Sequence, residues 1–172
     1  MKILFTGATG FIGKAFTSML LDNGHEVFAW VRNIEKARAV LDERIHPFIN
    51  LDDTNEQHFD AVINLAGAPI ADKRWTDSRK LLLRNSRIEL TKTLVEYING
   101  RKQKPGVFLS GSAIGYYGSQ PADSLLDESA KAVAGFQHSL CADWEAAALL
   151  LQSETTRVCL LRTGIEIGRA HV

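Results

Sequence analysis

Residues 2–13, with the sequence Lys-Ile-Leu-Phe-Thr-Gly-Ala-Thr-Gly-Phe-Ile-Gly, decide the fold. The first five residues form a short apolar run that predicts a buried strand. Apolar residues then recur at helical spacing, at Ile12, Phe16, Met19 and Leu20, which predicts a helix with these side chains facing the core. Three glycines therefore lie where a strand turns into a helix.

Glycine has a separate use at each position of such a turn. The first glycine permits the tight turn, the second lets the backbone approach a pyrophosphate, and the third lets the helix pack on the strand. The helix N-terminus presents free N–H groups to phosphate oxygens. We therefore predict a dinucleotide site here, formed by Gly7, Thr9, Gly10, Phe11, Ile12 and Gly13. The alternative is a glycine-rich turn that binds nothing.

Strand-like and helix-like segments alternate along the rest of the chain. Further strands are expected at 25–32, 45–49, 60–66, 106–110 and 156–162, and further helices at 34–41, 77–99 and 136–151. Pro47 places the 45–49 strand at an edge or a bend, and residues 111–129 are expected to form a loop. Helical crossovers of this length require parallel strands. The predicted fold class is α/β, a doubly wound parallel sheet of about six strands in three layers, the Rossmann fold.

Arg32 follows the second predicted strand, where an NAD-selective site usually carries an acidic residue for the ribose 2′-hydroxyl. A guanidinium at that point pairs instead with a 2′-phosphate. We therefore favour NADP over NAD as the cofactor. The alternative is an arginine exposed to solvent with no ligand.

The composition excludes several classes of protein. The 172 residues include 20 Lys and Arg against 20 Asp and Glu, so no net field attracts nucleic acid. No apolar run approaches the ~18–20 residues that span a bilayer. Cys141 and Cys159 make no disulfide framework, and the Cys and His residues lack metal-ligand spacing. We expect a cytoplasmic protein without a membrane partner or a metal.

Several longer motifs resemble one family. The glycine turn, Asn64 to Trp75, Ser110 to Gly118, Trp144-Glu145 and Leu161 to Gly164 together resemble extended short-chain dehydrogenases/reductases. The finer likeness is to the atypical NAD(P)-dependent epimerase/dehydratase proteins, some of them labelled cell-division inhibitors. The resemblance implies an NADP-binding domain over 1–172, with Asn64, Ala66, Gly67 and Ser110 beside the cofactor.

The resemblance also implies a smaller C-terminal substrate domain, which we expect to be absent from this chain. We expect a chain truncated after its sixth strand, the alternative being a complete minimal domain. A small-molecule substrate is expected, and the oligomeric state stays open, with a homodimer as one option.

The superfamily's chemistry uses a Tyr and, four residues later, a Lys that lowers the Tyr pKa. Gln137 and Cys141 occupy the corresponding positions, and neither replaces the missing groups. Ser112 matches the position that holds the substrate oxygen, and Tyr116 offers a phenol, so these two are the candidate catalytic residues. The alternative is that Tyr116 and Tyr117 only pack their loop.

A basic and partly aromatic region combines Lys73-Arg74-Trp75 with Arg84 and Arg87. It predicts either a site for an anionic substrate or cofactor phosphate, or a solvated helix face.

Three functions follow from these observations. The first is an NADP-dependent oxidoreductase or epimerase-like protein that acts on a small carbonyl or sugar-type substrate. The second is a non-catalytic dinucleotide-binding sensor or scaffold. The third is an inactive truncated remnant.

Overall fold

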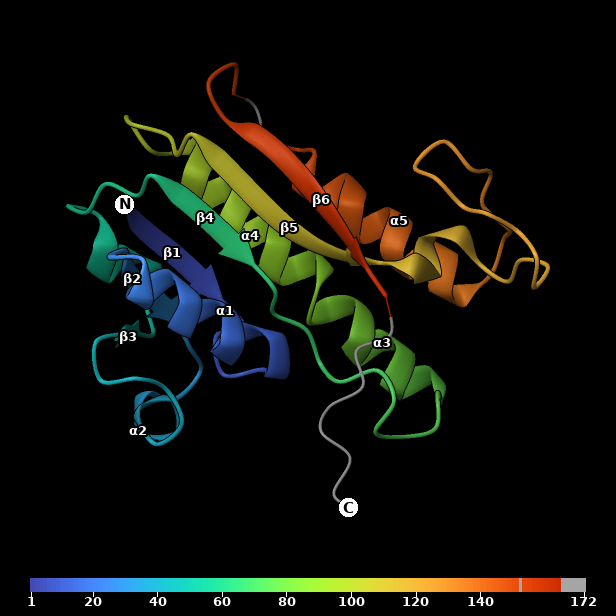
Figure 1. Ribbon diagram of the computed structural model, residues 1–172, viewed down its shortest axis with the longest axis horizontal. Coiled ribbons are helices and arrows are strands. Elements are labelled where there is room, and N and C mark those ends of the chain that lie inside the picture. Colours follow the sequence, from blue (N-terminus) through green and yellow to red (C-terminus); the bar gives the residue numbers. More distant parts are fainter. Residues whose placement is uncertain (152, 165–172) are drawn as a thin grey trace.

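The computed structural model describes residues 1–151 and 153–164. Within them, six parallel strands form one sheet in the order β3-β2-β1-β4-β5-β6 (Figure 1). The strands are β1 (Lys2–Thr6), β2 (Glu26–Trp30), β3 (His46–Phe48), β4 (Ala61–Asn64), β5 (Val107–Ala113) and β6 (Arg157–Thr163). The predicted doubly wound parallel sheet is confirmed.

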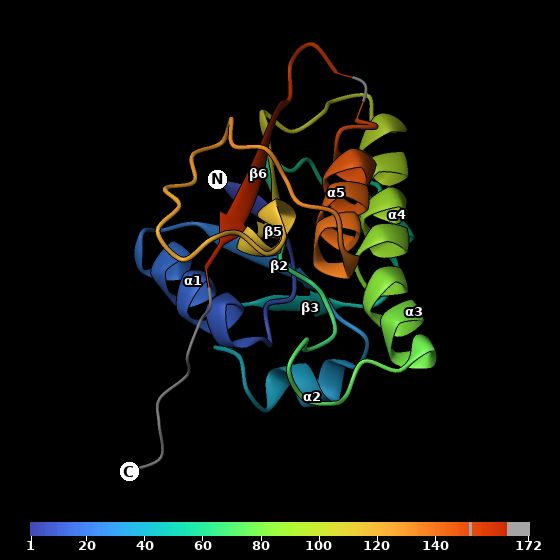
Figure 2. The same ribbon diagram turned by 90° about the vertical axis from the view of Figure 1, so that its right-hand side faces the viewer.

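Helices cover the sheet from both sides. Helix α1 lies on one face, and α4 and α5 lie together on the other (Figure 2). The helical segments are α1 (Phe11–Asp22), α2 (Ile34–Arg38), α3 (Asp77–Asn85), α4 (Ile88–Asn99), α5 (Phe136–Ala148), and the short 3-10 turns η1 (Leu51–Thr54) and η2 (Ile114–Tyr117). The three-layer arrangement is therefore confirmed.

The centre of the sheet is apolar on both faces. Every residue of β4 is buried, as is all of β1 after Lys2. Because both faces of a central parallel strand are buried, its sequence is a nearly continuous apolar run. This pattern allowed β1 and β4 to be predicted from the sequence. β3 lies at the edge, as Pro47 predicted, because proline cannot donate a ladder hydrogen bond.

The face of helix α1 that packs on the core differs from the face predicted from the spacing of its large apolar residues. Its buried residues are Gly13, Thr17, Leu20 and Leu21, whereas Ile12 is 38% exposed and Met19 53% exposed. The prediction for Ile12 and Met19 was wrong because Gly13 packs directly on the backbone of the turn at Gly7 and Ala8, and this close contact sets the rotation of the helix.

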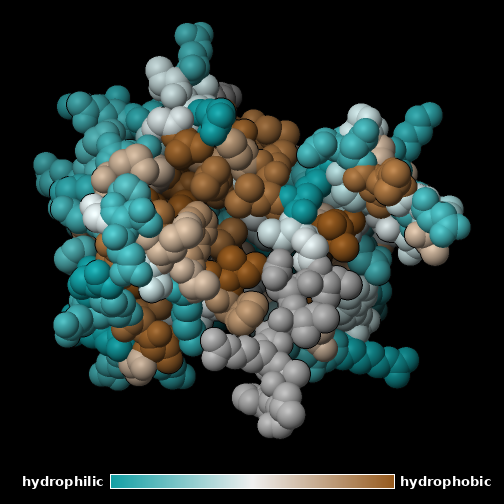
Figure 3. Space-filling view, in the orientation of Figure 1, coloured by the Kyte–Doolittle hydropathy of each residue, from teal (hydrophilic) through white to brown (hydrophobic). Residues whose placement is uncertain are grey.

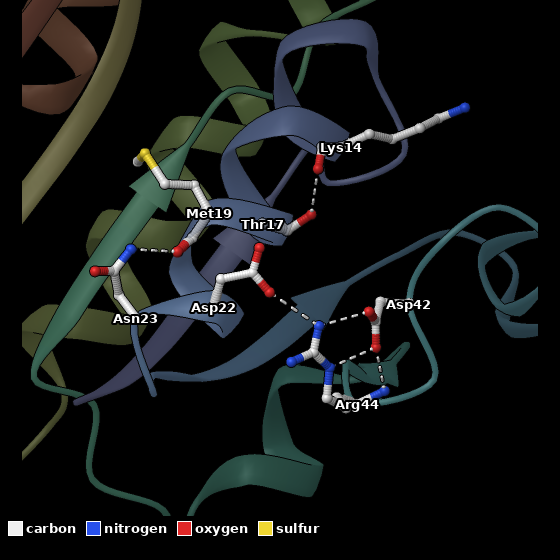
Figure 4. A network of polar contacts seen from close by, with 7 residues as sticks. All are labelled: Lys14, Thr17, Met19, Asp22, Asn23, Asp42 and Arg44. Carbon is white, nitrogen blue, oxygen red and sulfur yellow. Dashed lines mark hydrogen bonds and ion pairs between the residues drawn. The ribbon is translucent and has the colours of Figure 1, made fainter.

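Polar contacts tie the end of α1 to the neighbouring loop (Figure 4). Arg44 donates to Asp22 at the end of the helix and to Asp42 within its own loop. The hydrogen bonds from Arg44 lower the pKa of Asp42 to about 2. Asn23 closes the last turn by donating to the carbonyl of Met19.

The single helix expected over 77–99 is instead two helices, α3 and α4, which meet at Ser86 and Arg87. Ser86 Oγ accepts from the Ala68 N–H at 3.0 Å, and Arg87 Nη2 donates to the Ala68 carbonyl at 3.0 Å. The backbone N–H and the carbonyl of Ala68 are therefore both hydrogen-bonded to side chains at the break between the two helices. Sequence periodicity missed the break because both residues are compatible with a helix.

Strand β5 extends to Ala113, so residues 111–113 are not part of a loop as expected. Strand β6 supplies the reason, since Gly111, Ser112 and Ala113 pair with Leu161, Arg162 and Thr163.

On the α1 side of these two strands, apolar side chains gather on the surface (Figure 3).

Candidate functional site

The glycine turn has the geometry that its sequence predicted. Gly7 adopts φ +79°, in the region that favours glycine, and a Cβ there would lie 2.6 Å from the carbonyl carbon and oxygen of Leu65. A Cβ at Gly13 would lie 2.1 Å from the Gly7 carbonyl oxygen. Side chains are thus excluded where β1, β4 and α1 converge at the carboxyl edge of the sheet.

The start of α1 opens toward solvent beside this turn. Gly10 is the N-cap, and Phe11 is 60% exposed. The first N–H groups of any helix lack partners within it and carry partial positive charge. A bare turn that leads into such a helix end has the shape and charge that suit a pyrophosphate, and Thr9 and Ile12 lie beside it.

The end of β4 forms the next part of the candidate site. Ala66 is half-buried and Gly67 is exposed at the edge, so both are available to a ligand. Asn64 is fully buried and its side chain is occupied, since it accepts from Thr6 and donates to Thr91, both at 2.7 Å. Its side chain therefore acts on the site by holding the strand ends.

Ser110 and Arg32, two other predicted cofactor residues, differ in exposure. Ser110 is fully buried and its hydroxyl has no hydrogen-bond partner within residues 1–151 and 153–164. Arg32 follows β2 and is exposed. It is free to meet a ligand.

Ser112 belongs to a buried ionic network. Its hydroxyl donates to Glu145 Oε1 at 2.6 Å, and Arg162 holds the same carboxylate through two hydrogen bonds at 2.8 and 2.9 Å. Ser112 and Glu145 are only 3% and 5% exposed. The hydrogen bonds that Arg162 donates to Glu145 raise the pKa of Arg162, which stays cationic.

Tyr116 and Tyr117 surround the same arginine. The Arg162 guanidinium lies 3.5 Å from the Tyr116 ring centre, and its Nη1 donates to the Tyr117 hydroxyl at 3.0 Å. Tyr117 is buried, whereas Tyr116 is half-buried. The structure thus brings Ser112 and Tyr116, the two candidate catalytic residues, to opposite sides of the Glu145–Arg162 pair.

Sequence reasoning did not assign Glu145 and Arg162 a role. Their signal was present, because a charged residue lies on the core side of a helix next to Trp144 and another lies within an apolar strand. Their partnership joins α5 to β6 and cannot be read from local spacing.

Gln137 and Cys141, which occupy the positions of the superfamily's Tyr and Lys, lie side by side on α5. A Cβ at Gly115 would lie 3.3 Å from Gln137 Cβ and 3.4 Å from Cys141 Sγ. Burial, and then the charge of Glu145, raise the pKa of the Cys141 thiol. The thiol is therefore poorly ionised and supplies no charge to replace lysine.

The described residues, 1–151 and 153–164, contain neither a helix that could cross a membrane nor a cluster that could hold a metal ion. No helix there combines the length and apolarity needed to cross a membrane. No group of three or more His, Cys, Asp or Glu side chains is placed to hold a metal ion.

The fold and the glycine turn together define a dinucleotide-binding α/β domain. A model of the NAD dependent epimerase/dehydratase family matches residues 3–169, and the chain belongs to that family.

Relatives of known sequence agree with this assignment. The chain is 32% identical to the human epimerase family protein SDR39U1, covering 98% of this chain and 56% of the human protein. It is 38% identical to an epimerase family protein of Mycobacterium leprae, covering 97% of this chain and 53% of that protein. The chain spans about half the length of the curated relatives it matches.

Solved structures are similar over nearly the whole chain. The crystal structure of human SDR39U1 isoform 2 with NADPH superposes with a TM-score of 0.81 at 30% identity, over 99% of this chain and 56% of that one. A nucleoside-diphosphate sugar epimerase from Corynebacterium glutamicum gives a TM-score of 0.74 at 29% identity, over 94% of this chain and 33% of that one.

Proposed function

We propose that this chain is the NADP-binding part of an oxidoreductase or epimerase-like protein that acts on a small carbonyl or sugar-type substrate. The observation that carries the proposal is the glycine turn, where Gly7 and Gly13 leave no room for side chains and α1 begins at Gly10. The backbone of this turn would hold the pyrophosphate. Similarity to the human protein whose structure contains NADPH supports the choice of dinucleotide.

Arg32, Ala66 and Gly67 would contact other parts of the same cofactor. Arg32, exposed at the end of β2, would pair with the 2′-phosphate, and Ala66 and Gly67 would line the cofactor. The bound nicotinamide would supply hydride transfer. A cytoplasmic setting and a small-molecule partner are part of the same proposal.

The second candidate is a non-catalytic dinucleotide-binding protein. One observation favours it, because the Ser112 hydroxyl is buried and committed to Glu145, while Gln137 and Cys141 supply neither phenol nor ammonium. Turnover of NADPH with a panel of aldehydes, ketones and nucleotide sugars separates the two candidates. A turnover that survives Ser112→Ala would remove Ser112 from the mechanism.

Fluorescence titration with NADPH and NADH tests the binding proposal directly. We expect NADPH to bind more tightly, and Arg32→Gln to weaken NADPH about tenfold with little effect on NADH, since one charge-assisted contact is lost. Arg38→Gln, an exposed arginine on α2, is the matched control. Preference for NADH contradicts the role of Arg32, and no binding of either dinucleotide contradicts the proposed function.

A further inference from the structure

Two arginines hold consecutive carbonyl groups in the loop that follows β4. Arg79, on α3, donates to the Pro69 carbonyl, and Arg87, at the break before α4, donates to the Ala68 carbonyl at 3.0 Å. Both side chains are half-buried. Two guanidinium groups thus lie on neighbouring peptide units, and the charge of each opposes the other.

No acidic side chain balances this pair within residues 1–151 and 153–164. Neither arginine forms an ion pair with Asp or Glu there, although other arginines of the chain do so. Arg79 Nε is buried and has no hydrogen-bond partner in the same residues. Burial, and also the nearby charge of Arg79, lower the pKa of Arg87. Placing two like charges together without a counterion is costly, and an anion would relieve that cost.

The pair lies beside the candidate dinucleotide site. The Arg87 side chain packs against Gly67, where a Cβ would lie 2.9 Å from Cζ. Its guanidinium also lies 5.3 Å from the centre of the Trp144 ring, within the range of a cation–π contact. Lys73 and Arg74, both exposed, belong to the same loop and add positive charge.

We propose that Arg79 and Arg87 form a binding site for an oxyanion, a phosphate or carboxylate group, at the edge of the dinucleotide cleft. The forked N–H groups of arginine match such a group, and the loop carbonyls together with Trp144 hold the forks in place before it arrives. The proposal rests on the proposed function only in assigning the neighbouring cleft to a dinucleotide. The anion belongs either to the substrate or to the cofactor, and the experiment distinguishes these sources.

Calorimetric titration with inorganic phosphate at low ionic strength tests the site, first on the free chain and then on the chain saturated with NADPH. Saturation fills the pyrophosphate position at the glycine turn, so the remaining phosphate binding reports on the arginine pair. We expect Arg79→Gln to weaken this binding about tenfold. Arg79→Lys, which keeps the charge, should retain part of it.

The control is Arg157→Gln, because Arg157 is exposed at the start of β6, the opposite edge of the sheet. Thermal unfolding without ligand establishes that each variant is folded. Arg87→Gln serves as a second variant, with folding checked in the same way because Arg87 also supports the loop.

The outcomes separate the sources of the anion. Phosphate that binds alongside NADPH and depends on Arg79 indicates a substrate anion. Phosphate that NADPH displaces, together with NADPH binding that weakens in Arg79→Gln, indicates a cofactor phosphate. Arg79-dependent phosphate binding in a chain that binds no NADPH would retain the oxyanion site and remove the proposed function. Phosphate and NADPH binding that are both unaffected by Arg79→Gln, or absent phosphate binding accompanied by unaltered NADPH binding, overturn the site.

Discussion

At the scale of single residues, the missing side chain at position 13 sets how closely α1 approaches β1. A Cβ there would lie 2.1 Å from the Gly7 carbonyl oxygen and 2.9 Å from Ala8 Cα, and both are backbone atoms that cannot rotate away. The helix end that we assign to pyrophosphate binding is therefore positioned by this contact.

We expect Gly13→Ala to lower the free energy of unfolding by about 1–3 kcal/mol, since the helix must shift to admit the methyl group. It should also weaken NADPH binding. Gly100→Ala is the control, because Gly100 has φ −73° and its nearest non-neighbouring atoms lie at 3.5 Å and beyond. Denaturant titration and NADPH fluorescence measure both effects, and equal stability of the two variants would contradict this explanation.

Glu145 carries a buried carboxylate between Ser112 and Arg162. Its carboxylate accepts from Ser112 and twice from Arg162, and the side chain is almost fully buried. We expect Glu145→Gln to destabilise the fold by about 3 kcal/mol, because Arg162 loses its partner in a poorly solvated place.

Asp143→Asn, two residues earlier in the same helix, provides the comparison. Asp143 pairs with Arg84 at the surface, so its loss should cost less than about 1 kcal/mol. Chemical unfolding of both variants at neutral pH measures the difference. An equal loss of unfolding free energy in the two variants would show that burial does not strengthen the Glu145–Arg162 ion pair.

At the scale of elements, the break between α3 and α4 acts as a clamp on the loop after β4. Ser86 accepts from Ala68 N–H while Arg87 donates to Ala68 C=O. We expect Ser86→Ala to cost about 1 kcal/mol and to speed exchange of the Ala68 amide hydrogen about fivefold. Hydrogen exchange measured by NMR tests this, with Ser139→Ala on the exposed side of α5 as the control. Unchanged exchange at Ala68 would mean that the loop is held by other contacts.

The ion pair between Asp42 and Arg44, within the loop 39–45 beside α1, should depend on pH. The pKa of Asp42 falls from its ordinary value of 3.8 to about 2 because Arg44 donates to it. A lowered pKa stabilises the folded state fully above 3.8, and that stabilisation disappears as pH falls through about 2. We expect Asp42→Asn to lower the melting temperature near neutral pH, and the gap from the wild type to close over this acidic range. A gap that persists at the lowest pH would exclude ionisation as its cause.

The elements differ in how well the sequence alone predicted them. β1, β4 and the glycine turn were predictable because their patterns are local: apolar runs bounded by glycines. The helix break at Ser86 and the extension of β5 through Ser112 were not, because each depends on a partner distant in sequence, Ala68 or Arg162. The core face of α1 was misassigned because a glycine decides it.

At the scale of the whole molecule, the candidate site follows the same division. The turn that would hold a pyrophosphate was visible in twelve consecutive residues. Glu145 and Arg162, in contrast, meet where α5 packs on β6, and Arg79 and Arg87 meet through the carbonyls of the loop after β4. Spacing along the chain carries no information about such meetings. The packing of α5 on β6, and of the α3–α4 break on the loop after β4, determines which of these side chains meet.

The polar relay at the centre of the molecule has a mechanical consequence. Thr6 donates to Asn64, Asn64 donates to Thr91, and Trp144 donates to the same Thr91 hydroxyl at 3.0 Å. These hydrogen bonds join four segments, β1, β4, α4 and α5, through one buried point between the sheet and the helices. A partial opening that frees any one of these segments would leave a buried polar group without its hydrogen-bond partner, which is costly. The sheet and the helices α4 and α5 should therefore unfold cooperatively, as one unit.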